Sequence, residues 1–341
     1  MKLYKKLYYS TASFLPISLL KGISPVSLLL PYHHLISDEE VAHVRNLYGY
    51  KTRAQFETDL DYLLRYFEPL DPSVLIEHYR NGTAIPRNSF LLTFDDGMRE
   101  VYDLVEPILT RKGVSAVFFL NPAFLNNKEL FYRHKLSLSI DKIKKNNPGE
   151  TVRKTLAKAL SIESAEVNDI ISAIISINYT SRKLADDLGK YMEIDFDEYL
   201  RSKKPFLLDE QVNEMIAKGF YFGGHSLDHP NYKYINEQEQ LRQTISSIEY
   251  VKDNFKLNYS FFSFPHEDKN LDQHFFDNLL SMNAGIDVLF GTQNQKAESR
   301  NPVLHRFNAE NPSIKIEHLI KGMSLLNTAN SLLNNNQVRR N

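Results

Sequence analysis

The stretch L-L-T-F-D-D-G at residues 91–97 is an apolar run that ends in two adjacent carboxylates and a glycine. Residues 98–112 follow with helical spacing, so the pattern predicts a buried strand that leads into a helix. Adjacent strand residues point to opposite faces, so Asp95 and Asp96 reach one site only where the strand ends and the backbone turns. Gly97 permits that turn. The same residues also fit an ordinary Asp-Asp-Gly turn at a helix start.

Similar strand-like runs recur along the chain, and segments with helical spacing separate most of them. The predicted strands are residues 26–32, 89–95, 115–120, 220–225, 260–264, 285–290 and 303–307, and the predicted helices are residues 52–67, 98–112, 209–218, 237–254 and 271–282. Strand and helix in repetition predict an α/β fold with a parallel sheet, either open or closed into a barrel.

One segment breaks the alternation. Residues 126–204 are rich in Lys, Glu, Ser, Leu and Ile with helical spacing and no convincing strand. We expect a helical insertion there, on a loop near the face where barrels carry their active sites. The expected organisation is an N-terminal segment at 1–25, a barrel at 26–325 that includes this insertion, and a frayed tail at 326–341.

The amino-acid composition limits the classes of ligand and of metal site that this chain can have. The 341 residues include 41 Lys plus Arg and 42 Asp plus Glu, and no strongly basic block occurs. This balance argues against nucleic acid as the main ligand, because phosphate binding needs a concentrated positive surface. Cysteine is absent, so disulfides, thiolate metal sites and cysteine nucleophiles are excluded. Any metal must be held by His and carboxylates.

The N-terminus has basic and aromatic residues but no long apolar run. Pro16 and Lys21 interrupt it, so we expect neither a transmembrane helix nor a signal peptide. Lys2, Lys5 and Lys6, interleaved with Tyr4, Tyr8 and Tyr9, fit either a segment packed on the domain or contact with a membrane surface. The expected location is the cytoplasm or the periphery of the inner membrane, and the sequence does not predict an oligomeric state.

A pair of histidines follows another predicted strand, in G-G-H-S-L-D-H-P at residues 223–230. His225 and His229 are four residues apart, which suits two imidazoles on one cation. They share the carboxyl end of the predicted sheet with Asp95 and Asp96, where parallel barrels gather their active sites. One carboxylate plus two imidazoles leaves positions on a metal open for water and substrate, and the other carboxylate can act as general base.

These two motifs together resemble those of the NodB-type polysaccharide deacetylases, carbohydrate esterase family four. The resemblance covers roughly residues 28–124 and 205–311 and implies a deformed (β/α) barrel of about seven parallel strands. It implies a metal-dependent hydrolase that removes N-acetyl groups from amino sugars of an acetylated polysaccharide or glycolipid. The alternatives are an O-acetyl esterase, a deformylase of a lipid-linked sugar, or a sugar-binding member that has lost catalysis.

The resemblance also assigns roles to the motif residues. It implies that Asp95 is the catalytic base and that Asp96, His225 and His229 bind a divalent metal. Zinc is the metal expected first, with cobalt, nickel and manganese as alternatives.

Two further motifs of the family have partial counterparts. In F-F-S-F-P-H-E-D at residues 261–268, Pro265 is present and His266 stands where the family places a backbone N–H donor for the oxyanion, but the Arg that often supports the base is missing. In V-L-H at residues 303–305, His305 fits the general acid that protonates the leaving amine. The neighbouring Arg306 is the alternative inward residue, because alternation forbids both from facing the centre of one regular strand.

Two histidines end the first predicted strand, in P-Y-H-H at residues 31–34. We expect a substrate contact or a core hydrogen bond from His33 rather than a further metal ligand. In the insertion, F-Y-R-H-K at residues 131–135 fits either a contact with sugar or phosphate or a solvated helix face.

Overall fold

The computed structural model describes residues 15–282, 285–298 and 301–340, and its main feature is a parallel sheet of eight strands. The strand order is β10-β9-β8-β7-β6-β5-β2-β11. The bounds are β2 Pro31–His33, β5 Leu92–Phe94, β6 Ala116–Leu120, β7 Tyr221–Gly224, β8 Phe261–Ser263, β9 Val288–Gly291, β10 Val303–His305 and β11 Phe307–Asn308. Each predicted run contains at least one strand.

The last segment closes the sheet into a barrel. Only Arg306 separates β10 from β11, yet β10 pairs with β9 and β11 pairs with β2 at the opposite edge. Seven strand positions therefore surround the centre, which confirms the expected deformed (β/α) barrel. A small sheet, with β4 (Ser89–Phe90) between β1 (Leu28–Leu29) and β3 (Glu68–Pro69), lies at the amino ends of the first strands.

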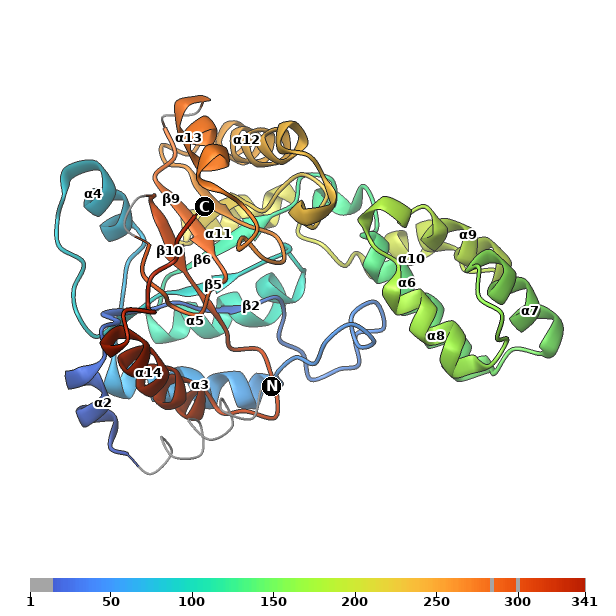
Figure 1. Ribbon diagram of the computed structural model, residues 1–341, viewed down its shortest axis with the longest axis horizontal. Coiled ribbons are helices and arrows are strands. Elements are labelled where there is room, and N and C mark those ends of the chain that lie inside the picture. The colour runs from blue at the N-terminus through green and yellow to red at the C-terminus, as the bar shows by residue number, and fades with distance from the viewer. Residues whose placement is uncertain (1–14, 283–284, 299–300, 341) are drawn as a thin grey trace.

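Helices cover the outside of the barrel (Figure 1). They are α2 Ile17–Ile23, α3 Arg53–Tyr66, α4 Ser73–Asn81, α5 Glu106–Lys112 with the preceding π-helical turn Val101–Val105, α11 Asp209–Ala217, α12 Glu237–Asn254, α13 Gln273–Met282 and α14 Ile316–Leu332. Local signals explain several ends: Thr52 and Gln55 form a capping box on α3, and Gly113 ends α5 with φ 65°. The sequence did not predict α4 and α14.

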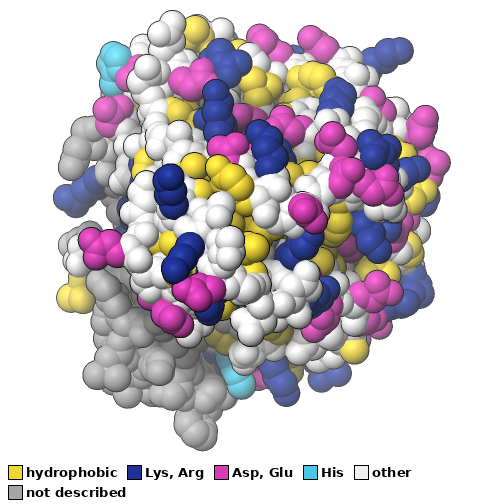
Figure 2. Space-filling view, turned by 90° about the vertical axis from the view of Figure 1, so that its right-hand side faces the viewer, with side chains coloured by type: hydrophobic (Ala, Val, Ile, Leu, Met, Phe, Trp, Pro, Cys, Tyr) yellow, Lys and Arg dark blue, Asp and Glu magenta, His cyan; other side chains and the backbone are white. Residues whose placement is uncertain are grey.

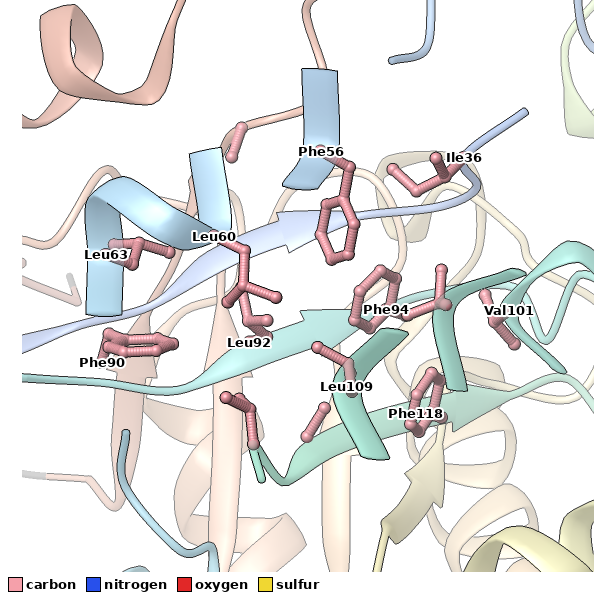
Figure 3. Close-up of a cluster of buried hydrophobic side chains, with 14 of the residues drawn as sticks. Ile36, Phe56, Leu60, Leu63, Phe90, Leu92, Phe94, Val101, Leu109 and Phe118 are labelled. Carbon is pink, nitrogen blue, oxygen red and sulfur yellow. The ribbon is translucent and has the colours of Figure 1, made fainter. Parts of the chain in front are cut away.

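An aromatic core joins the sheet to α3 and α5 (Figure 3). Phe94 stacks on Phe118 with ring centroids 5.1 Å apart, and Phe118 stacks on Phe222 at 5.5 Å. Phe56 and Leu60 of α3 cover these rings from outside. Each fully buried side chain of this size stabilises the fold by about 1.5–3 kcal/mol, so the strands that carry the polar residues are held rigidly.

The segment between β6 and β7 forms a helical arm that projects from the barrel (Figure 1). Its helices are α6 Tyr132–Asn146, α7 Glu150–Ala159, α8 Val167–Ser176, α9 Leu184–Tyr191 and α10 Phe196–Lys203. All of residues 126–204 are described, and none of them forms a strand. The arm buries its own apolar cluster, which continues into Leu35 and Val41 of the loop after β2.

The two ends of the chain differ from expectation in different ways. The frayed tail expected at 326–341 is wrong for its described part, because α14 continues to Leu332 and Arg340 pairs with Asp268 and Glu298. The N-terminal basic and aromatic residues, which fit either packing on the domain or contact with a membrane surface, lie within residues 1–14, outside the described residues. Within the described chain, no helix combines the length and apolarity needed to cross a bilayer.

Candidate active site

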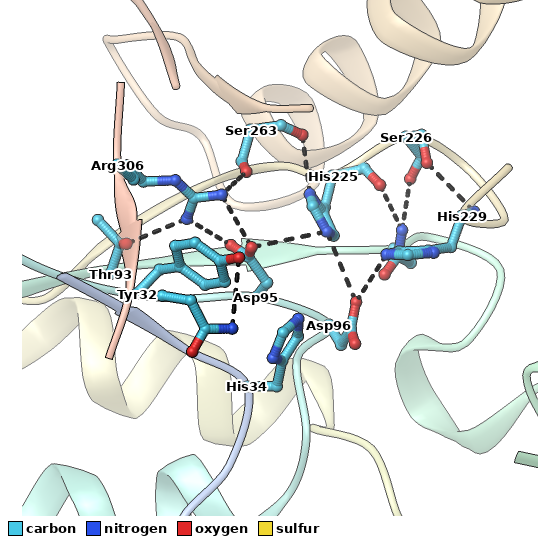
Figure 4. A network of polar contacts seen from close by, with 12 residues as sticks. Tyr32, His34, Thr93, Asp95, Asp96, His225, Ser226, His229, Ser263 and Arg306 are labelled. Carbon is cyan, nitrogen blue, oxygen red and sulfur yellow. Dashed lines mark hydrogen bonds and ion pairs between the residues drawn. The ribbon is translucent and has the colours of Figure 1, made fainter. Parts of the chain in front are cut away.

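The polar motif residues meet at the carboxyl edge of the barrel (Figure 4). Asp95 and Asp96 directly follow β5, and His225 directly follows β7. His229 comes from the loop after β7, and His34 directly follows β2. Since every strand pair of the barrel is parallel, the ends of these strands lie at one edge. The sequence argument from strand ends therefore holds for these five residues.

Unusual backbone conformations aim these side chains. Asp96 has φ 71° and His229 has φ 59°, both in the left-handed region that residues other than glycine rarely adopt. Gly97 follows with φ 61°, and a Cβ there would stand 2.9 Å from a methyl carbon of Leu120. A sharp turn thus brings two consecutive carboxylates into one site, which a continuing strand would prevent.

Three side chains form a compact cluster with the ligand types of a metal site. The Asp96 Oδ1 atom lies 3.2 Å from His229 Nε2 and 3.6 Å from His225 Nε2. His225 Nδ1 lies 2.8 Å from the Ser263 carbonyl oxygen. An N–H at Nδ1 donates to that carbonyl, so the Nε2 lone pair is directed at the cluster.

The buried polar atoms of this cluster fit a divalent cation. Asp96 Oδ1 and His229 Nδ1 are buried without a hydrogen-bond partner within the described chain. Burial raises the pKa of Asp96 above its usual range, and burial together with neighbouring positive charge lowers the pKa of His229 well below its usual value. A bound cation would remove the cost of burying the Asp96 charge. Asp96, His225 and His229 are therefore the residues that would hold a metal.

Asp95 is engaged by an arginine instead. Arg306 is fully buried and donates two hydrogen bonds to the Asp95 carboxylate, at 2.7 and 2.8 Å. It also donates to Thr93 Oγ1 at 3.0 Å and to the Ser263 hydroxyl. Burial alone would raise the pKa of Asp95, but Arg306 and then His225 outweigh it and hold the pKa at about 2. Asp95 is thus ionised and oriented at neutral pH.

The expectation that His305 is the general acid is not supported. Its Nε2 atom lies 3.0 Å from Glu298 and its Nδ1 atom 3.8 Å from Asp268, and it does not line the cavity that contains Asp95. The inward position belongs to Arg306, which sits at the break between β10 and β11. His305 and Arg306 do point to opposite sides of the chain, but Arg306 faces the barrel centre where His305 was expected.

The two histidines after the first strand also take opposite sides. His33 is buried against Phe56 and Phe94, with ring centroids 5.5 and 5.6 Å away, so of the two expected roles it has the core position and not the substrate contact. His34 lines the cavity instead. Glu310 accepts a hydrogen bond from His34 Nδ1 at 2.8 Å and another from the His34 backbone N–H at 2.9 Å. Burial disfavours the imidazolium, but the Glu310 charge prevails and raises the pKa of His34 to about 10.

His266 borders the metal cluster from the loop after β8. Its ring centroid lies 4.6 Å from that of His229, and its φ is 58°. Burial, and next the Arg133 charge, lower the pKa of His266 to about 3. The backbone N–H of His266 donates to no acceptor within the described chain, whereas Pro265 before it has no N–H to offer.

Two neighbouring cavities share this site. The first, of about 310 Å³, contains the metal cluster and Asp95, and is also lined by His34, Tyr48 and Arg133. The second, of about 900 Å³, shares Tyr32, His266 and Thr292 with it. Side-chain amides line much of this second cavity, namely Gln293, Asn294, Asn327, Asn330, Asn334, Asn335 and Gln337. Small-ligand sites fall in this size range, roughly 300–1,000 Å³.

Sequence reasoning missed two of the partners that shape the site. Glu310, which pairs with His34, follows the barrel's last strand and belongs to no recognised motif. Arg306 was only an alternative, although the missing Arg of the third motif was a signal that another strand had to supply one. Both are contacts between residues more than 200 positions apart.

Comparison with known proteins identifies the relatives of this fold. The family model described as polysaccharide deacetylase matches residues 83–275. Among solved structures, the Streptococcus pyogenes deacetylase PplD in complex with acetate has a TM-score of 0.54 at 16% identity, covering 88% of this chain and 99% of that one. IcaB from Ammonifex degensii has a TM-score of 0.53 at 14% identity, covering 89% and 98%. A polysaccharide deacetylase from Bacillus cereus has a TM-score of 0.51 at 10% identity, covering 87% and 69%. No curated protein matches the sequence significantly.

Proposed function

We propose, from the premise that this chain belongs to the polysaccharide deacetylase family, that it is a metal-dependent hydrolase that removes N-acetyl groups from amino sugars of a glycan. The observation that carries the proposal is one cavity that contains both the Asp96–His225–His229 cluster and the Arg306-bound Asp95. Asp96, His225 and His229 would hold a divalent cation such as zinc, which would polarise the acyl oxygen and lower the pKa of a water molecule toward about 7.

Asp95 acts on the attacking water. Its two Arg306 hydrogen bonds fix the carboxylate plane, and the pKa of about 2 keeps it ionised. So low a pKa makes Asp95 a weak base, so its task is to orient the water and to accept its proton as the new C–O bond forms. The backbone N–H of His266 is the proposed donor to the oxyanion, because it borders the cluster and has no other acceptor within the described chain.

His34 is the proposed proton donor to the leaving amine, in place of His305. Glu310 holds its Nδ1 atom and favours the imidazolium, so Nε2 is the nitrogen that meets a substrate. Cleavage of the C–N bond then yields acetate and a neutral amine. His34→Gln should reduce amide hydrolysis more than hydrolysis of an activated ester, because an alkoxide departs with less need of a proton. Equal losses of activity on the amide and on the ester would show that His34 is not the proton donor to the leaving amine.

The amide-lined cavity supports a chain of sugars as substrate. It continues from the catalytic cavity through Tyr32, His266 and Thr292, and side-chain amides both donate to and accept from sugar hydroxyls.

The test is to measure acetate and formate released from N-acetylated, N-formylated and O-acetylated sugar oligomers. The metal-loaded protein should release acetate from the N-acetylated oligomer, chelation should abolish release, and Asp95→Asn should reduce it on the order of 10²-fold or more. Preference for the O-acetylated oligomer would make the protein an O-acetyl esterase, and preference for the N-formylated oligomer would make it a deformylase. Oligomer binding without release of either acid would indicate a sugar-binding protein.

A further inference from the structure

Arg133 is a cationic side chain in the catalytic cavity that the proposed mechanism does not use. It is the second residue of α6, it is half-buried, and it lines the same cavity as Asp96 and His229. Phe131, two residues before Arg133, holds this start of the arm against the metal cluster, because its ring lies 4.9 Å from the His229 ring. The helical arm thus contributes a charge directly to the site.

No carboxylate within the described chain pairs with Arg133. Some basic residues of the arm do have acidic partners: Lys135 lies 2.8 Å from Asp186, and Lys145 lies 2.9 Å from Asp141. The surface at the arm's end of the molecule likewise intersperses Lys and Arg with Asp and Glu (Figure 2). Arg153 and Arg182 of the arm are likewise half-buried without a carboxylate partner, but of these three arginines only Arg133 lines the catalytic cavity.

The other charges of the cavity do not supply the missing partner. Asp95 is matched by Arg306, and His34 is matched by Glu310. Asp96 remains, and a divalent cation on the cluster would exceed its single negative charge. With Arg133 added, the cavity has an excess of positive charge, which favours an anionic ligand.

We propose that Arg133 determines specificity by binding an anionic group, a phosphate or a carboxylate, carried by the substrate close to the acylated amine. The planar guanidinium matches either group with two parallel hydrogen bonds, and the half-buried setting strengthens them. This inference rests on the proposed function, since it names the class of sugar which that site accepts. It also gives the arm a role in substrate selection.

The experiment compares three N-acetylated sugars: N-acetylglucosamine, its 1-phosphate and the carboxylate-bearing N-acetylmuramic acid. The native protein should show a higher kcat/KM for one or both charged sugars, and the better one identifies the anion. Arg133→Gln should lower the ratio of charged to neutral kcat/KM by about 10-fold to 100-fold, the range for a charge-assisted hydrogen bond. Arg133→Lys should lower it less, because the charge remains without the planar fork.

Lys135→Gln is the matched control, two residues beyond Arg133 on the same helix with its own partner Asp186, and it should leave the ratio unchanged. An unchanged ratio in Arg133→Gln, or a native preference for the neutral sugar, would overturn the inference. Calorimetric titration of the native protein and Arg133→Gln with the 1-phosphate and with N-acetylmuramic acid distinguishes failure of the anion-site inference from failure of the proposed function. Arg133-dependent binding without hydrolysis would retain the anion site and reject the deacetylase, whereas binding of neither charged sugar would reject the anion site.

Discussion

Two buried clusters in this chain combine imidazole with carboxylate groups, and they differ in what neutralises them. Asp96, His225 and His229 face a cavity, and no Lys or Arg within the described chain pairs with Asp96. The second cluster consists of Asp268, Glu298 and His305, and Arg340 from the C-terminal segment lies 2.6 Å from Asp268 and 2.8 Å from Glu298.

The comparison shows that ligand type alone does not make a metal site. The second cluster receives its cation from the protein, so its carboxylates are already paired and His305 is held between them. The first cluster retains a buried Asp96 oxygen without a hydrogen-bond partner. Because an unpaired buried charge is costly, an external cation would stabilise the first cluster, whereas the second already has its cation in Arg340.

The largest effect is expected from His229→Ala. Loss of one of three protein ligands should reduce metal content to a small fraction of one equivalent and turnover on the order of 10³-fold. Metal analysis and acetate release measure the two effects. His305→Ala is the matched control from the second cluster and should retain its metal. Full metal content in His229→Ala would show that the two clusters have been assigned the wrong way round.

Asp95→Asn should show that Asp95 is the general base and not a metal ligand. The variant should keep its metal, because Asp95 pairs with Arg306, and lose turnover on the order of 10²-fold or more. Metal analysis with steady-state kinetics tests both parts. If the metal is lost while the Asp96→Asn variant retains it, the two carboxylates have exchanged roles.

Arg306→Lys should shift the acid side of the pH profile. In the native protein the pKa of Asp95 is about 2, below its usual value, so the stability from its ionised form is present above the unfolded pKa and is lost as pH falls through about 2. A weaker partner lets burial raise this pKa. Both kcat/KM and the free energy of unfolding should therefore fall at a higher pH than in the native protein. Coincident profiles would mean that Arg306 does not control Asp95.

Arg340→Gln should have the smallest effect on turnover and act on stability instead. Removing the cation leaves two buried carboxylates with only His305 between them, which should lower the free energy of unfolding by about 3 kcal/mol. Urea unfolding measures this, and metal content should stay at the native level. A loss of metal in this variant would indicate that the second cluster binds it.

The sequence was sufficient for features set by local pattern. The strand ends at Asp95 and His225, and the helical arm at residues 126–204, follow from hydrophobic periodicity and from motifs that are contiguous in the chain. These signals act over a few residues, so they survive without knowledge of the tertiary structure.

The features that the sequence did not determine depend on distant contacts. Whether His305 or Arg306 points inward depends on where β10 leaves β9 and β11 joins β2, which is a property of barrel closure. The C-terminal segment appears polar and frayed in sequence, yet Arg340 is ordered by carboxylates some 40 and 70 positions earlier. No local pattern encodes either outcome.

Anomalous X-ray diffraction at the zinc absorption edge, from crystals grown with zinc, tests the central claim most directly. One strong anomalous peak is expected within bonding distance, about 2.0–2.2 Å, of Asp96, His225 and His229, and no peak is expected between Asp268, Glu298 and His305. A peak at the second cluster with Arg340 displaced, or no peak at the first cluster, would contradict that claim.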